Sequence, residues 1–459
     1  MGTYQDVYEG AQSDATGFWL EAANGIDWVT PPQTALDDSN PPFYRWFADG
    51  TLNTCFNAVD RHVDAGRGDQ VAIIYDSPIT GNASKMTYGA LQTATARFAG
   101  MLQSLGVEKG DRVIIYMPMI IESIVAMLGC ARLGAVHSVV FGGFAAAELA
   151  TRIDDAKPKA IISASCGHEP GRIVAYKPLL DEAIEIAAHK PDHCVIYQRE
   201  ALAADLVAGR DIEWHAAHEN APELPPVTVK ATDPLYVLYT SGTTGQPKGV
   251  VRDNGGHAVA LAWSMPNIYA TGPGDVYWAA SDIGWVVGHS YIVYAPLLAG
   301  CTTVLFEGKP VGTPDAGVFW RIISEHKVKV LFTAPTAFRA IKRADPDADY
   351  LDKYDTSSLE YLFLAGERAD PDTIIWAQDK LNVPVIDHWW QTETGWPMCA
   401  NPVGIEQLPI KLGSPSVPMP GYEIDILDEE GSVKAPDELG SIAVRLPMPP
   451  ACLPTVWGA

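Results

Sequence analysis

Short apolar runs alternate with longer helical stretches along most of this chain, and this alternation limits the possible fold more than any other feature. In the first half, apolar runs lie at 71–75, 112–117, 135–140 and 160–164, and amphipathic stretches lie at 88–105, 120–133 and 145–155. Strands that alternate with helices form right-handed βαβ units and a parallel sheet. We therefore expect an α/β fold with a doubly wound parallel sheet that begins at residues 71–75.

The same alternation returns in the second half of the chain and predicts a second doubly wound sheet. Its expected strands lie at 276–280, 302–306, 328–333, 361–365 and 383–387. After Gly421 the pattern changes to two alternating runs around Glu430 and Gly431, which is typical of antiparallel strands. The final PMPPACLPTVWGA predicts a tail without helix or strand.

These patterns divide the chain into three parts. Residues 1–60 are rich in aromatic residues and proline, and we expect short helices there that drape over the body. Residues 61–415 form the α/β body with two subdomains, and residues 416–459 begin a small antiparallel β subdomain. A chain of 459 residues is too long for one ordinary core, which agrees with this division.

Composition excludes several classes of partner. The net charge of -24 argues against nucleic acid, because phosphates along a backbone would find no neutralising surface. The seven cysteines include no CxxC pair, which indicates reduced thiols in the cytoplasm rather than disulfides or zinc.

The N-terminus lacks an apolar signal segment. The most apolar window, 113–140, contains Glu122 and Arg132, so we expect a strand and a core helix and no membrane span.

The stretch from Asp233 to Arg252 carries the first chemical signal. A buried strand is expected at 235–239, and the nine residues from Ser241 to Gly249 are almost all glycine, hydroxyl or lysine. Glycines let backbone N–H groups approach a ligand, hydroxyls donate hydrogen bonds, and Lys248 adds a positive charge. The loop can hold a polyphosphate, although it departs from the Walker A pattern. Its other candidate residues are Thr240, Ser241, Gly242, Thr243, Thr244 and Gly245. Without further context, a glycine-rich surface turn explains the same residues.

The second signal is HWWQTETGW, from His388 to Trp396. It follows an expected strand, and open α/β sheets bind ligands at the carboxyl ends of their strands. Thr392 can donate to a phosphate or acyl oxygen, and Glu393 offers a hard oxygen ligand for Mg²⁺. Alternatively, Glu393 is a solvated carboxylate and the tryptophans fill the core.

These two motifs resemble a known superfamily. TSGTTGQPKG resembles the signature loop of the adenylate-forming enzymes, which include acyl-CoA synthetases, nonribosomal peptide adenylation domains and firefly luciferase. WWQTETG resembles the second motif of the acetyl- and propionyl-CoA synthetase branch. The resemblance extends from about residue 4 to the end of the chain. It implies ATP and coenzyme A as substrates, Mg²⁺ as the metal, and no nucleic-acid or membrane partner; it leaves the oligomeric state open.

The resemblance also implies roles for residues around the nucleotide. Thr392 would contact the α-phosphate, Glu393 would hold the metal, and with Lys248 they would form the catalytic group. Asp387 would accept a hydrogen bond from the adenine amino group, and Gln391 would lie along the nucleotide. The other expected nucleotide contacts are Gly366, Glu367, Arg368, His388 and Trp389.

For the acyl pocket, the resemblance implies that Trp285, Val286 and Val287 line the hydrocarbon tail, that Gly288 leaves room beside them, and that Trp390 closes the end. Ala365 stands where acetate-specific members usually carry valine, which opens the pocket by about one methylene. One methylene is worth about 1 to 3 kcal/mol in such a pocket. We therefore expect propionate to be preferred, with acetate, acrylate or butyrate weaker.

Coenzyme A would lie over the loop that contains Phe141, Gly142 and Gly143, with Arg172 near its phosphates and Ala334 also in contact. Acetyl-CoA synthetases often have another arginine where this chain has Glu169. The runs at 247–257 and 169–184 are more similar to propionyl-CoA synthetases.

The implied reaction has two steps. Propionate attacks the α-phosphorus of ATP to give propionyl-adenylate and pyrophosphate, and the CoA thiol then displaces AMP. The alternatives are an acetyl-CoA synthetase and a nucleotide-binding module without chemistry. Similar enzymes continue well beyond this point with a small catalytic C-terminal domain, so we expect this sequence to be the large N-terminal domain alone, with low activity.

Overall fold

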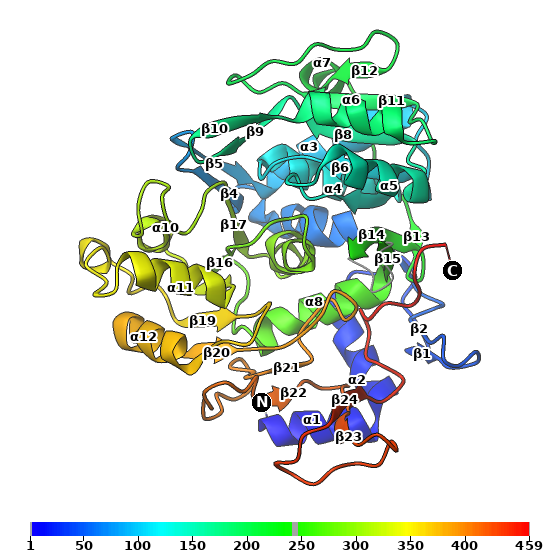
Figure 1. Ribbon diagram of the computed structural model, residues 1–459. Coiled ribbons are helices and arrows are strands. Elements are labelled where there is room, and N and C mark those ends of the chain that lie inside the picture. The colour runs from blue at the N-terminus through cyan, green and yellow to red at the C-terminus, as the bar shows by residue number, and fades with distance from the viewer. Residues whose placement is uncertain (1, 241–246, 459) are drawn as a thin grey trace.

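The computed structural model describes residues 2–240 and 247–458, and its core consists of two mixed, mainly parallel sheets with helices on their faces (Figure 1). The first sheet has the order β12 (Asp211–Glu213), β11 (His193–Tyr197), β8 (Ala160–Ala164), β6 (Arg112–Tyr116), β7 (Val136–Val139), β14 (Pro234–Thr240) and β15 (Lys248–Asp253). The second has the order β20 (Val385–Asp387), β19 (Tyr361–Leu364), β18 (Val330–Thr333), β16 (Val276–Ala279), β17 (Thr302–Phe306), β4 (Val71–Ser77) and β5 (Asn82–Thr87). Neighbouring strands are parallel except at the edges, where β15 pairs antiparallel to β14 and β5 to β4.

Helices fill the connections between the strands, as the alternation predicts. They are α3 (Tyr88–Ser104), α4 (Ile121–Leu133), α5 (Ala146–Ala156), α6 (Tyr176–Ile186), α7 (Trp214–Glu219), α8 (Gly255–Asn267), α9 (Ala295–Leu298), α10 (Val318–His326), α11 (Pro335–Ala344) and α12 (Pro371–Leu381). Their ends follow local sequence signals. The Thr87 hydroxyl accepts the Ala90 N–H at the start of α3, and α4 ends at Gly134, whose φ of 77° favours glycine.

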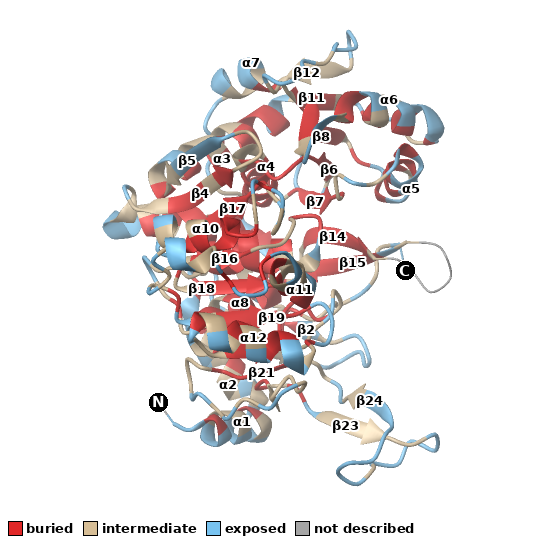
Figure 2. Cartoon of the chain, turned by 60° about the vertical axis from the view of Figure 1, so that its left-hand side comes forward, coloured by how far each residue is buried: buried red, intermediate tan, exposed pale blue. Residues whose placement is uncertain are grey.

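The N-terminal segment packs on the second half of the chain. It contains α1 (Tyr4–Ser13) and α2 (Ala15–Ala22). Trp19 of α2 is fully buried, and its ring lies 5.9 Å from that of Trp396 and 6.0 Å from that of Trp263. The expectation of short helices draped on the body is confirmed. Figure 2 shows buried residues concentrated in the two sheets and exposed residues in the outer helices and the β23–β24 end.

Short strand pairs complete the structure. They are β1 (Leu36–Asp37) with β2 (Arg45–Trp46), β3 (Thr51–Leu52) with β13 (Val229–Lys230), β9 (Cys166–Glu169) with β10 (Arg172–Ala175), β21 (Cys399–Ala400) with β22 (Val417–Pro418), and β23 (Ile424–Leu427) with β24 (Ser441–Val444). The last pair is antiparallel, as expected after Gly421. Among the described residues, no helix has the length and apolar character that a membrane crossing requires.

One expectation about the fold is wrong. Residues 71–75 do not open the first sheet, because β4 pairs with β17 in the second sheet. Periodicity identifies a strand but carries no information on its partner, so the sequence order of the strands misled the assignment. The tail contains no helix or strand among the described residues, as expected, but it is bonded to β15: Val456 forms an isolated antiparallel bridge with Val250, and the Trp457 N–H donates to the Gly249 carbonyl at 2.7 Å. It covers the exposed edge of β15.

Candidate active site

The carboxyl ends of β18, β19 and β20 bring several predicted residues together. These strands are parallel neighbours, so the residues that follow them emerge at one edge of the second sheet. The Ala365 N–H donates to the Thr333 carbonyl at 3.1 Å, and the His388 N–H donates to the Leu364 carbonyl at 3.0 Å. Ala334, Ala365 and His388 thus lie at the same edge.

Asp387 and His388 are both buried at this edge. The Asp387 carboxylate accepts the Ala369 N–H at 3.2 Å, and burial raises the pKa of this carboxyl to about 6. His388 is held by the Leu364 carbonyl at Nδ1, 2.7 Å away, and by the Tyr269 hydroxyl at Nε2, 3.0 Å away. Burial lowers the pKa of His388 to about 4, so its imidazole is neutral. A neutral histidine with both nitrogens engaged is suited to positioning its neighbours, Asp387 and Trp389.

Trp390 packs into an aromatic box. Its ring centroid lies 5.5 Å from Tyr291, 6.2 Å from Phe332 and 6.4 Å from His388. Its indole N–H is buried and has no hydrogen-bond partner among the described residues. Phe332 lies in β18 and Ala365 follows the neighbouring strand β19, so the aromatic box and Ala365 lie at the same edge of the sheet. Ala365 is 5% exposed.

The turn from Gln391 to Gly395 is fastened to β15 by Arg252. This fully buried guanidinium donates to the Glu393 carbonyl at 3.1 Å and to the carbonyls of Thr392 and Ala451. Lys248 begins the same strand four residues earlier, so it points to the same face as Arg252. Lys248 is exposed, Thr392 and Glu393 are half-buried, and Gln391 is exposed. Thr240 is half-buried and pairs with Lys248 across the hairpin. The predicted phosphate-loop residues Ser241, Gly242, Thr243, Thr244 and Gly245 lie outside the described residues.

The residues expected around the purine follow β19 and are exposed. Gly366 has a φ of 102°, a backbone conformation that favours glycine. The Glu367 carboxylate is bound by Arg339, which also contacts Asp370 at 3.2 Å. The Arg368 guanidinium lies against Gly413, so the 366–368 turn is fixed on both sides.

The expected acyl residues 285–288 lie between the aromatic box and the 141–144 loop. Trp285 is 47% exposed and packs on Phe141 with the ring centroids 5.3 Å apart, which places it at the loop end. Val286 and Val287 are half-buried and directly precede the π-helical segment Gly288–Tyr294. Gly288 packs on the backbone of Asp282 and Ile283, where an added Cβ would lie 2.2 Å from the Asp282 carbonyl oxygen.

Three of the five expected CoA residues lie together: Gly142, Gly143 and Arg172 line one cavity of about 200 Å³. Ala334, in contrast, lies at the end of β18 and lines neither this cavity nor its neighbour of about 290 Å³. Gly142 allows close packing on Tyr176, because an added Cβ would lie 2.0 Å from the Tyr176 hydroxyl oxygen. The contact between this loop and α6 therefore requires glycine. The sequence alone did not reveal this contact.

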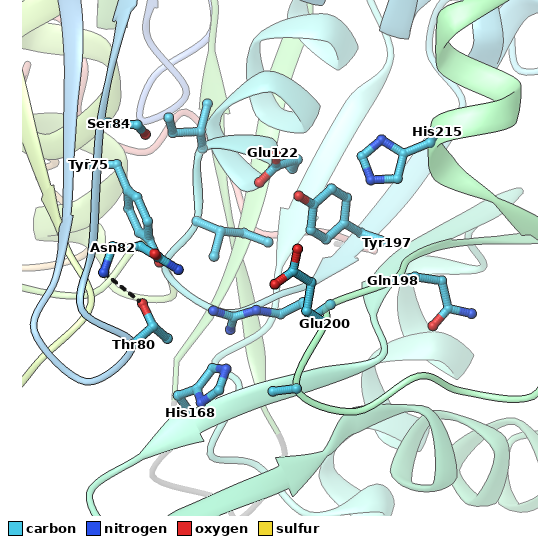
Figure 3. Close-up of a pocket in the computed structure, with 14 residues that line it drawn as sticks. Tyr75, Thr80, Asn82, Ser84, Glu122, His168, Tyr197, Gln198, Glu200 and His215 are labelled. Carbon is cyan, nitrogen blue, oxygen red and sulfur yellow. Dashed lines mark hydrogen bonds between the residues drawn. The ribbon is translucent and has the colours of Figure 1, made fainter.

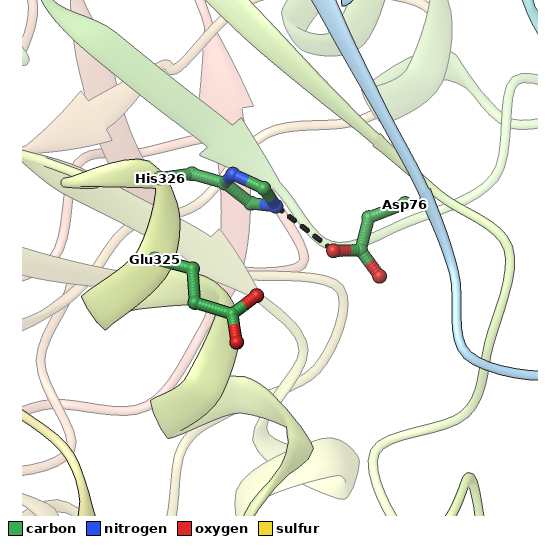
Figure 4. A group of neighbouring side chains, drawn as sticks. All are labelled: Asp76, Glu325 and His326. Atoms are coloured by element: carbon green, nitrogen blue, oxygen red, sulfur yellow. Dashed lines mark hydrogen bonds and ion pairs between the residues drawn. The ribbon is translucent and has the colours of Figure 1, made fainter. Parts of the chain in front are cut away.

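The Glu393 carboxylate fits the expected metal role, since it accepts no hydrogen bond from any described residue and is only half-buried. A different acidic group, Asp76, Glu325 and His326, gathers beside β4 (Figure 4). There the His326 Nε2 lies 2.8 Å from Asp76, and the Arg321 guanidinium donates to both carboxylates at 2.7 Å. Because Arg321 already supplies a cation, we assign no metal to this group.

A cavity of about 790 Å³ lies elsewhere, at the carboxyl end of the first sheet. Figure 3 shows Tyr75 and Asn82 on one side of it and Glu122, Tyr197 and His215 on the other. None of the site residues predicted from the sequence lines it.

Two functional candidates were missed by sequence reasoning. Arg252 was visible in the GVVR run, and its spacing of four from Lys248 was a usable signal. Tyr291, which packs on Trp390, carried no signal, because an aromatic residue in an apolar run is usually core.

Comparison with known proteins shows the family to which this chain belongs. The model of the AMP-binding enzyme family matches residues 59–449, and that of the acetyl-coenzyme A synthetase N-terminus matches residues 4–58. Over 99% of this chain, an uncharacterised Pseudomonas aeruginosa protein is 51% identical and is covered over 73% of its length. The short-chain family member 3 acyl-CoA synthetase of Rattus norvegicus, a mitochondrial protein, is 49% identical and covered over 67%. A propionate--CoA ligase of Escherichia coli is 47% identical and covered over 72%. The chain therefore belongs to the AMP-binding enzyme family, in a branch of AMP-forming acid-thiol ligases.

Proposed function

We propose that this protein ligates propionate to CoA with ATP, through propionyl-adenylate, and releases AMP and pyrophosphate. The observation that carries the proposal is the juxtaposition of Ala365 and the Trp390 aromatic box at one sheet edge. A small side chain at the wall and an indole at the end suit a short acyl chain of about three carbons. The similarity to an E. coli propionate--CoA ligase supports the same acid.

The chain's own residues have distinct tasks in this reaction. The Asp387 carboxylate accepts a hydrogen bond from the adenine amino group, and the 366–368 turn flanks the purine. Lys248 and Thr392 bind and orient the phosphates, with Arg252 holding β15 against the 391–395 turn. Glu393 would hold Mg²⁺, which supplies charge neutralisation for the phosphates. Catalysis in such a site comes mostly from positioning and electrostatic stabilisation.

The experiment that tests the substrate is the ratio of kcat/KM for propionate and acetate. We expect propionate to be preferred, and Ala365→Val should shift the ratio toward acetate by roughly 10-fold or more, because added methyl groups fill the space of one methylene. Ala216→Val is the matched control, because Ala216 is exposed on α7 and lies outside the expected site. An unchanged ratio in Ala365→Val would remove Ala365 from the acyl pocket.

An acetyl-CoA synthetase is the second candidate, favoured by the match of residues 4–58 to the acetyl-coenzyme A synthetase N-terminus. A kcat/KM higher for acetate than for propionate would establish it. A nucleotide-binding module without chemistry is the third candidate. Absence of acid-dependent AMP formation, with AMP binding retained, would favour that reading.

A further inference from the structure

Two cavities meet over the 141–144 loop, and one carboxylate stands between them. The cavity of about 200 Å³ that contains Arg172 and a neighbouring cavity of about 290 Å³ share Gly142, Gly143, His168 and Glu169. Lys309 lines the larger cavity. Glu169 therefore has a cation on each side, from two different parts of the fold.

Two cations flank the Glu169 carboxylate. The Lys309 Nζ lies 3.3 Å from the Glu169 carboxylate, and Arg172 is the cross-strand partner of Glu169 in the β9–β10 pair. The side chains of Lys309 and Glu169 are 48% and 39% exposed. An ion pair this exposed adds little to stability, so Lys309 can exchange its carboxylate for a ligand anion.

The backbone holds Lys309 in place at this rim. It follows β17 of the second sheet, and its N–H and carbonyl both bond the Thr313 hydroxyl, at 2.8 and 2.7 Å. Glu307, two residues earlier, is engaged by Arg199 at 2.8 Å and cannot compete for Lys309. The remaining acid in the larger cavity, Asp282, accepts the Gly284 N–H at 2.7 Å.

We propose that Lys309 binds a phosphate of CoA together with Arg172, and that Glu169 is the counter-ion which Lys309 leaves when CoA arrives. The inference rests on the proposed function, because that function brings CoA to the 141–144 loop. It adds a cation that follows β17 of the second sheet to a site whose other cation, Arg172, belongs to the β9–β10 pair. CoA would then bind both subdomains at once.

Steady-state kinetics with CoA and dephospho-CoA test the proposal. Lys309→Ala should raise the KM for CoA roughly 10- to 100-fold, the usual size of a lost hydrogen bond to a charged group, with the KM values for ATP and acid unchanged. Lys309→Arg should retain most of the affinity. Glu169→Gln should lower the KM for CoA roughly twofold to fivefold, because a competing anion is removed. Lys327→Ala is the matched control, since Lys327 is an exposed lysine paired with Asp355 at 3.2 Å and lies outside both cavities.

Dephospho-CoA separates the two sources of phosphate. If the effect of Lys309→Ala disappears with dephospho-CoA, Lys309 binds the 3′-phosphate; if it persists, Lys309 binds the diphosphate. If Lys309→Ala left the KM unchanged for both CoA and dephospho-CoA, the proposal would be overturned. The same holds if the variant raised the KM values for CoA, ATP and acid equally and also lowered the Tm. The proposed function is tested separately by trapping the acyl-adenylate with hydroxylamine in the absence of CoA. If no acyl-adenylate forms, the ligase activity itself is rejected. If it forms and Lys309→Ala leaves the KM for CoA unchanged, only the role of Lys309 is rejected.

Discussion

Asp387 is a buried carboxylate whose ionisation should govern nucleotide affinity. Burial raises its pKa to about 6 from 3.8, so the free protein takes up a proton as the pH falls through about 6. A neutral acid accepts hydrogen bonds less strongly than a carboxylate. We therefore expect AMP affinity, measured by calorimetry from about pH 5 to pH 8, to fall below a midpoint near 6.

Asp387→Asn should weaken AMP binding roughly 10-fold and abolish that midpoint. Asp372→Asn, at an exposed position, should keep it. The same shift has a linked effect on folding: because the folded pKa is raised, the contribution of Asp387 to stability is full below pH 3.8 and is lost as the pH rises through about 6. If Asp387→Asn retained the midpoint in AMP affinity, another group would have to be responsible.

At the scale of elements, β15 and the 391–395 turn act as one unit through Arg252. Its guanidinium lies under Gly395, where an added Cβ would be 2.8 Å from the Arg252 Cζ, and the Ser290 hydroxyl donates to the Gly395 carbonyl at 2.6 Å. Three carbonyls depend on one buried cation. The turn that carries Thr392 and Glu393 is therefore set by a residue of the hairpin strand.

Arg252→Met should remove these hydrogen bonds and leave buried carbonyls unpaired. We expect the free energy of unfolding, measured in urea, to fall by about 3 kcal/mol or more, and ATP affinity to fall more than CoA affinity. Arg445→Met is the matched control, because Arg445 is exposed and paired with Asp425 at 2.8 Å. Equal losses of ATP and CoA affinity would indicate general unfolding in place of a local change at the turn.

Periodicity predicted most elements, because period 2 and period 3.6 are local properties of a chain. The expected helix at 88–105 is α3, and the expected strand at 383–387 ends at Asp387 as β20 does. The partner of a strand is a non-local property, so β4 was assigned to the wrong sheet and the pairing of Val456 with Val250 was missed. The motifs near Glu393 and Trp390 were visible as sequence, whereas the Lys309 contact with Glu169 joins residues far apart in the chain and required coordinates.

At the scale of the whole molecule, one buried ion pair joins the two sheets. Arg199 follows β11 of the first sheet, and its two Nη atoms lie 2.8 and 2.9 Å from the carboxylate of Glu307, which follows β17 of the second. The hydroxyls of Tyr75 and Ser77 donate to the same carboxylate. The side chains of Arg199 and Glu307 are 9% and 5% exposed, so water screens this pair little. This ion pair is one of the contacts between the two sheets, and its Glu307 also lines the cavity of about 290 Å³ over the 141–144 loop.

Glu307→Gln should destabilise the protein by about 3 to 5 kcal/mol, because it leaves the Arg199 charge buried without a counter-ion. The double variant Arg199→Met with Glu307→Leu should recover part of that loss, because an apolar pair of similar volume replaces both charges but leaves the Tyr75 and Ser77 hydroxyls without their acceptor. Urea unfolding monitored by circular dichroism measures both, with Lys327→Ala, from an exposed pair, expected to change stability by less than about 1 kcal/mol. If Glu307→Gln were as stable as the wild type, the ion pair would not be what holds the two sheets in register.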